Sequence, residues 1–290
     1  STYDSLMFFM NPKLPDRFYN IFNVDTGKEI GTFCYRGSGP GEVAALGPIF
    51  HFFKEKGDLK TLLFAPNEEK LFIWNITQSI KRDTTVMDKQ ISYPWREENG
   101  GAPYYLMFLK DENTLITELQ SFPLNDKEAT LPAYQKRTLD TNKLLKSFSS
   151  YKKSIRNDEA SILPESFFYS NDAIKPDGTK VVQAMVHLAQ LNILDLETGH
   201  VSGYRLEGEP DFSVFKSDEK IKSYFTRVQA DDNYIYAVYW GKERWERFET
   251  PHMNIIHVYD WDGNLIQKIE TDYSIGQMWI DPIPVSYTHL

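Results

Sequence analysis

The chain has 290 residues, of which 41% are hydrophobic and 14% aromatic, and it carries a net charge of −9 with a pI near 5.3. A chain of this size can bury a core without disulfides or metals, and its acidic surface argues against a nucleic-acid partner, since phosphate backbones are repelled. Its single cysteine, Cys34, excludes an internal disulfide and suits a buried structural thiol, and no apolar run approaches the roughly 18 residues needed to span a bilayer.

Short strand-like runs joined by polar turns recur along the chain, whereas helical periodicity is nearly absent. In chain order, the turns between paired strands are Asp25–Lys28, Asn75–Gln78, Asp140–Lys143, Asp195–Gly199 and Asp260–Asn264. Asp and Asn side chains hydrogen-bond their own backbone in such turns, and Gly supplies the positive φ that tight hairpins require. The five turns therefore predict five β-hairpins.

A second strand pair precedes each later hairpin. These pairs are Ile49–Phe53 with Thr61–Phe64, Tyr104–Leu109 with Thr114–Leu119, Phe168–Ile174 with Lys180–Leu188, and Tyr224–Gln229 with Tyr234–Trp240. A small sandwich cannot hold so many strands, and a single barrel does not explain the repeat. The sequence predicts an all-β fold, a β-propeller of four-stranded antiparallel blades, forming one domain over residues 1–290.

A glycine-rich corner follows the first hairpin. It consists of Arg36 and Ser38 together with the structural residues Gly37, Gly39, Pro40, Gly41 and Glu42. The spacing does not fit a phosphate-binding loop, because no Gly-Lys-Ser/Thr and no long helix follow. We interpret it as a backbone corner between one blade and the next.

This Gly-Pro-Gly-Glu corner resembles the first-blade signature of the TolB-like six-bladed propeller families of Bacteroides-type bacteria. The blocks Tyr234–Lys242 and Ile256–Asn264 resemble a late blade of that family. The resemblance covers most of the chain. It implies six blades and an exported protein at the periplasm or cell surface, in many members lipid-anchored through an N-terminal leader. It brings no catalytic residues.

Both ends of the chain depart from the family pattern. The first blade lacks a clear innermost strand, while Gly276–Ile280 is expected to open a further blade. Val285–Leu290 resembles a translated sequencing adapter more than a natural strand. We therefore expect five recognisable blades, a partial sixth and an incomplete ring.

One loop interleaves aromatic and charged side chains, which suits stacking on a partner or a carbohydrate. Its candidate binding residues are Trp240, Arg244, Trp245 and Arg247. The structural alternative is that Trp240 ends a buried strand and Trp245 packs on the rim.

No pattern of catalytic or metal-binding residues is found. The six histidines show no helical zinc spacing, Asp260 and Asp262 lack the downstream Glu of a calcium loop, and no nucleophile elbow is present. We expect no cofactor and a non-enzymatic binding or scaffold module for an unidentified protein, peptide or glycan. The alternative is a metal-dependent hydrolase of the lactonase or strictosidine-synthase-like type, for which Glu118, Asn171 and Asp172 are the candidate ligands.

Overall fold

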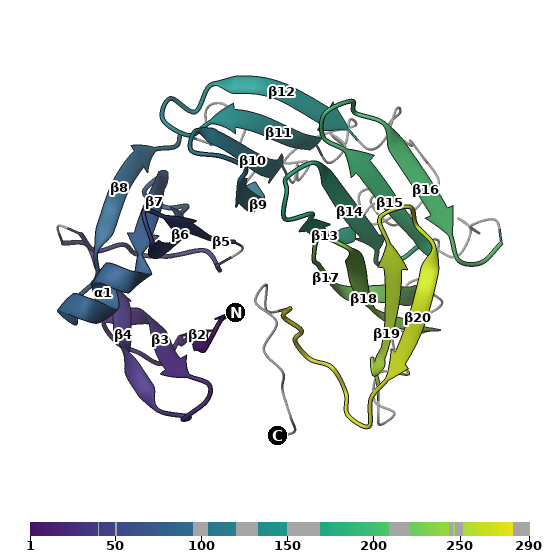
Figure 1. Cartoon of the computed structure of the whole chain (residues 1–290), viewed down its shortest axis with the longest axis horizontal. Helices are drawn as coiled ribbons and strands as arrows, with labels where there is room; N and C mark the ends of the chain where they lie inside the picture. The colour runs from purple at the N-terminus through teal and green to yellow at the C-terminus, as the bar shows by residue number, and fades with distance from the viewer. Residues whose placement is uncertain are drawn as a thin grey trace. The chain divides into compact units, whose positions relative to one another are not determined.

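The computed structural model describes residues 1–39, 41–49, 51–94, 104–119, 133–149, 169–208, 221–243, 246 and 252–280. These residues form five antiparallel sheets of four strands each (Figure 1). The predicted all-β propeller of four-stranded blades is confirmed, and five sheets in the described part fit the expected incomplete set of six. None of the helices described is long and apolar enough to cross a membrane.

The chain divides into two compact units, which we describe separately. The first contains Ser1–Leu119, Gln135–Lys146 and residues 281–290, and the second contains Gln120–Tyr134 and Ser147–Ile280. The boundary runs through the third sheet, so the single domain over residues 1–290 stays a prediction.

The first two sheets lie wholly in the first unit. The first is β1 (Thr2–Tyr3), β2 (Leu6–Met10), β3 (Arg17–Asn23) and β4 (Glu29–Tyr35). The second is β5 (Phe52–Glu55), β6 (Asp58–Ala65), β7 (Lys70–Asn75) and β8 (Met87–Ser92), with α1 (Ile76–Arg82) between its last two strands.

The remaining sheets repeat the same order of neighbouring strands. The third is β9 (Tyr104–Leu109), β10 (Thr114–Leu119), β11 (Ala133–Thr138) and β12 (Leu144–Ser149). The fourth is β13 (Ser170–Ile174), β14 (Lys180–Met185), β15 (Gln190–Asp195) and β16 (Val201–Arg205). The fifth is β17 (Lys222–Ala230), β18 (Tyr234–Glu243), β19 (Ile255–Asp260) and β20 (Leu265–Glu270).

Apolar side chains fill the space between consecutive sheets within each unit. In the first unit, one cluster joins the second and third sheets through Leu62, Ile73, Ile91, Met107 and Leu115, among others. In the second unit, a second cluster joins the fourth and fifth sheets, where β13 and β17 are in contact. A blade has two apolar faces, and such packing covers one face with the next blade.

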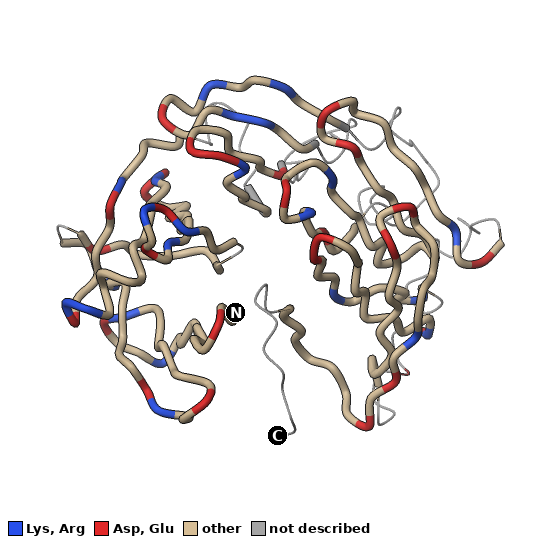
Figure 2. Tube along the Cα trace, in the orientation of Figure 1, with Lys and Arg blue, Asp and Glu red and all other residues tan. Residues whose placement is uncertain are grey.

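The hairpin turns are held by acidic side chains, and Figure 2 shows Asp and Glu at many of them. Carboxylates that accept backbone N–H bonds in their own turns are Asp111, Asp177, Asp195, Asp231 and Asp260. The acidic character of the chain is thus partly structural, because these carboxylates satisfy turn amides.

Three expectations were wrong. The turn expected at Asn75–Gln78 is the start of α1, because the Asn75 side chain caps the helix by accepting the Gln78 N–H and Ile76 is fully buried. The first sheet does have an innermost strand, but β1 is only two residues long, too short to show an alternating pattern. Residues 276–280 form no strand in the described structure, since a strand needs a hydrogen-bonded neighbour and none is described for this segment.

The glycine-rich corner leads from β4 towards β5, as expected. Gly37 (φ +156°) and Gly41 (φ +77°) adopt conformations that favour glycine, whereas Gly39 has no positive φ. Pro40 lies outside the described residues. Cys34 is buried, as expected of a structural thiol, and burial raises its pKa.

Candidate functional site

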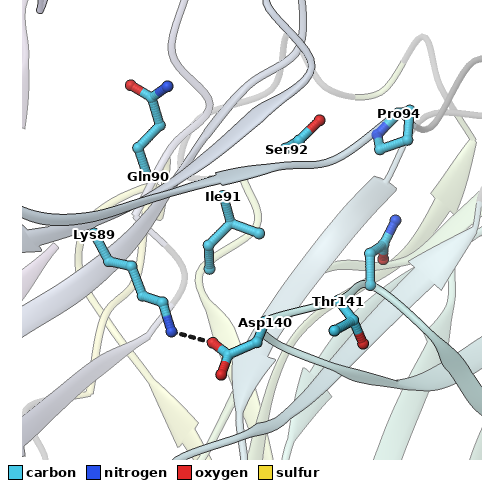
Figure 3. Close-up of a pocket in the computed structure, with 8 residues that line it drawn as sticks. Lys89, Gln90, Ile91, Ser92, Pro94, Asp140 and Thr141 are labelled. Atoms are coloured by element: carbon cyan, nitrogen blue, oxygen red, sulfur yellow. Dashed lines mark hydrogen bonds and ion pairs between the residues drawn. The ribbon is translucent and has the colours of Figure 1, made fainter.

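A groove of about 550 Å³ lies in the first unit beside the outer strand of the second sheet. One wall is formed by Lys89, Gln90, Ile91, Ser92 and Pro94, and the other by Asp140, Thr141 and Asn142 of the β11–β12 turn (Figure 3). We call this the β8 groove. All eight lining residues lack an aromatic ring, and their side chains are a mixture of polar and aliphatic groups.

An ion pair between Lys89 and Asp140 joins the two walls (Figure 3). Both side chains are exposed, at 42% and 54%. An exposed ion pair contributes only about 0–1 kcal/mol, because both charges are well solvated apart. The bridge is therefore weak enough for a bound molecule to displace.

Side-chain hydrogen bonds stabilise the wall formed by the β11–β12 turn. Arg137, which is 4% exposed, donates from its guanidinium to the carbonyl oxygen of Asn142 at 2.8 Å and to the Asn142 Oδ1 at 3.3 Å. The Thr138 and Thr141 hydroxyls are 2.6 Å apart and share a hydrogen bond. The buried, charge-assisted bonds from Arg137 and the exposed bond between the two hydroxyls fix the turn, so the groove is formed before any ligand arrives.

The opposite wall is anchored at the start of β8. The register shifts between Ile73 and Trp74, which leaves Asp88 as the extra residue of a bulge. Asp88 accepts from Asn75 Nδ2 at 2.9 Å and pairs with Lys60 at 2.5 Å. Burial lowers the pKa of Lys60, but its hydrogen bonds and ion pairs to Asp88 and Glu55 outweigh burial and raise that pKa.

A model of the TolB-like 6-blade propeller-like family matches residues 1–282. The chain belongs to this family. The predicted family resemblance is confirmed, and the five sheets are blades of a TolB-like propeller.

Two solved structures resemble this TolB-like chain. One is a member of the DUF4221 family from Bacteroides vulgatus ATCC 8482, with 13% identity, a TM-score of 0.56, and coverage of 91% of this chain and 78% of that one. The other, provisionally named an exported protein, comes from Bacteroides fragilis NCTC 9343, with 12% identity, a TM-score of 0.49, and coverage of 93% and 70%. At these identities the first likeness supports the fold alone. No curated protein matches the chain.

The binding residues predicted from sequence are only partly described in this TolB-like propeller. Trp240 lies in β18, is 8% exposed, and has its ring centroid 6.5 Å from that of His252. Arg244, Trp245 and Arg247 lie outside the described residues. A ligand role for these four residues stays a prediction, although the burial of Trp240 fits the structural alternative.

The candidate metal ligands of the hydrolase alternative lie on β10 and β13. Asn171 and Asp172 are consecutive in β13, so their side chains point to opposite faces of the sheet. Asn171 Nδ2 donates to the Phe225 carbonyl at 3.1 Å, and Asp172 accepts from the Tyr134 hydroxyl. Glu118 is buried in β10. Asn171 and Asp172 thus serve separate contacts, and no group of three possible metal-binding side chains occurs among the described residues.

Sequence reasoning missed the β8 groove. Its walls come from residues about fifty positions apart, and neither wall contains a recognised motif. The available signal was indirect: an outer strand with a polar sequence, followed by a turn on the next blade that carries Asp, Thr and Asn.

Proposed function

We propose that this TolB-like propeller is a non-enzymatic binding or scaffold module and that the β8 groove is its ligand site. The observation that carries the proposal is the preformed groove between β8 and the β11–β12 turn, bridged by the exposed Lys89–Asp140 pair. Ligand sites are concave, largely preformed and supplied with a few polar groups that fix orientation. The β8 groove has these properties.

The test is a binding comparison between two tryptophan variants. Thr141→Trp places a large ring in the groove, whereas Glu197→Trp places the same ring in the equivalent β15–β16 turn of the fourth sheet, away from the groove. A phage-displayed library of short random peptides and a glycan array serve as probes of the wild-type protein. We expect ligands that bind the wild type and Glu197→Trp alike, but bind Thr141→Trp at least about tenfold more weakly. Ligands that ignore Thr141→Trp would refute the β8 groove as the site.

An exported location accompanies this proposal. Membership of the TolB-like family favours the periplasm or the cell surface. A lipid anchor supplied by an N-terminal leader stays a prediction. Fractionation of cells that express the native gene checks the exported location. We expect the protein outside the cytoplasm, and its recovery in the cytoplasmic fraction would contradict this location.

A further inference from the structure

The β8 groove runs along the outer edge of the second sheet. The order of this sheet is β5-β6-β7-β8, so β8 pairs with β7 on one side and with no described strand on the other. An edge strand presents a row of backbone N–H and C=O groups that can pair with another chain. The four residues Lys89–Ser92 line the groove along this edge.

The hydrogen-bond register identifies which β8 residues face outwards. Ser92 lies opposite Lys70, and the Tyr93 N–H donates to the Glu69 carbonyl at 2.6 Å. This is the pattern around a non-hydrogen-bonded pair, after which the two kinds of pair alternate. Ile91 therefore bonds to β7, while Gln90 and Ser92 direct their N–H and C=O groups away from it. Among the described residues, no backbone partner is found for these outward groups.

The chemistry of the groove favours a peptide over a sugar. Carbohydrate sites commonly offer an aromatic ring for stacking, and the eight lining residues include none. Outward backbone donors and acceptors at every second residue instead match the repeat of an extended polypeptide, whose affinity comes from main-chain hydrogen bonds.

We infer that the β8 groove binds an extended segment of a partner protein by strand addition, the segment pairing with the backbone of Gln90 and Ser92. This inference rests on the proposed function, since it names how the same groove binds. The bound segment then lies between the two walls of the groove, with β8 on one side and Thr141 and Asn142 on the other. Binding displaces the Lys89–Asp140 ion pair, so that both charges become available to the segment.

The same strand carries features that restrict uncontrolled pairing. The bulge at Asp88 and the charged side chain of Lys89 both discourage an unrelated strand from adding along the whole edge. Pairing is therefore confined to the short stretch that the groove frames, which suits a short segment and a specific partner.

The test uses a peptide selected on the wild-type protein from the phage-displayed library. Gln90→Pro removes an outward N–H and leaves the bonds to β7 intact, since proline is tolerated at such positions of edge strands. Val201→Pro is the matched control. Val201 of β16 lies opposite Leu194 of β15, and the neighbouring Asp195 N–H donates to the His200 carbonyl at 2.9 Å. The backbone N–H of Val201 therefore points away from β15, as that of Gln90 points away from β7. We expect Gln90→Pro to weaken binding at least about tenfold and Val201→Pro to leave it unchanged. Two versions of the peptide are then compared, each N-methylated at every second amide and offset from the other by one residue. The version methylated at the amides that pair with β8 should lose binding, and the other version should keep it.

Amide hydrogen exchange supplies a second readout. The peptide should slow amide exchange at Gln90 and Ser92 of the wild-type protein. The Thr141→Trp variant should show no such protection at either residue. A peptide that requires an open groove but tolerates Gln90→Pro and both N-methylation patterns would overturn strand addition while leaving the proposed function standing. Failure to select any peptide sensitive to Thr141→Trp would overturn strand addition, and the glycan array then decides the proposed function separately.

Discussion

The carboxylate of Glu42 accepts a hydrogen bond from the backbone N–H of Gly39 at 2.9 Å, and the Gly39 carbonyl accepts from the Glu42 N–H at 3.1 Å. The acidic side chain thus folds back over the glycine-rich corner and occupies a donor that a phosphate would need. A β-carbon built on Gly37 would overlap this same carboxylate. The corner therefore requires glycine and glutamate together.

Replacing Gly37 with Ala should destabilise the protein by about 1–3 kcal/mol, because its φ of +156° is strained for other residues and the new methyl meets Glu42. Urea unfolding measures the effect. Gly39→Ala is the matched control and should cost less, since Gly39 has no positive φ and a β-carbon there lies 3.1 Å from Glu42 Oε2. Equal losses for the two variants would count against this account of the corner, and so would saturable nucleotide binding at the loop.

Replacing Thr85 with Val should destabilise the protein by about 1–3 kcal/mol, the cost of leaving a buried donor unpaired. Cys34 has a left-handed backbone (φ +65°). Its buried N–H donates to Thr85 Oγ1 at 2.7 Å, and this bond joins the first sheet to the loop before β8. Thr85→Ser keeps the hydroxyl and should retain most of the stability in thermal unfolding. If Val and Ser variants unfold alike, the hydrogen bond is not what matters.

Replacing Ser79 with Ala should cost about 1–3 kcal/mol, because the Ser79 hydroxyl accepts from Trp74 Nε1 at 2.9 Å and from the Val86 N–H at 2.8 Å. Trp74 is fully buried, with the rings of Phe8, Tyr19 and Phe33 around it. The exposed Lys81 on the same helix provides the control, since Lys81→Ala should change the free energy of unfolding little. Tryptophan fluorescence during denaturation follows both variants.

Acid should weaken the β15–β16 turn through Asp195. Its pKa is held below the ordinary value of 3.8, first by the backbone N–H of Thr198, against the opposing effect of burial, and then by the Thr198 hydroxyl and the Glu197 N–H. A carboxyl with a lowered folded-state pKa contributes stability above its unfolded pKa and loses it as pH falls through the folded pKa. Asp195→Asn keeps an acceptor but cannot titrate, so the stability lost below about pH 4 should be smaller in this variant. Identical pH profiles would contradict the assignment.

The repeating part of the fold could be predicted from the sequence because its signals are local. Each Asp- or Asn-based turn is specified by a few adjacent residues, and four of the five expected turns are hairpins. The fifth became α1, although Asn75 followed by Gln78 is the spacing of a helix cap and could have been recognised. β1 could not be predicted, because a strand of two residues is too short to show an alternating pattern of apolar and polar side chains.

The β8 groove could not be predicted for a physical reason. It depends on which edge of β8 is left without a partner, and on how the β11–β12 turn of the next blade stands beside it. Neither property is encoded in a contiguous pattern, because the groove is a product of packing between two sheets. Trp240 attracted attention because aromatic residues are conspicuous in a sequence, and the structure buries it.

A crystal structure of the protein with a library-selected peptide is the most direct measurement of the central claim, that the β8 groove is the ligand site. We predict the peptide as an added strand beside β8, bonded to the backbone of Gln90 and Ser92, with the Lys89–Asp140 pair opened. A peptide bound beside Trp240, or anywhere that leaves the Lys89–Asp140 pair intact and the β8 groove empty, would contradict the claim.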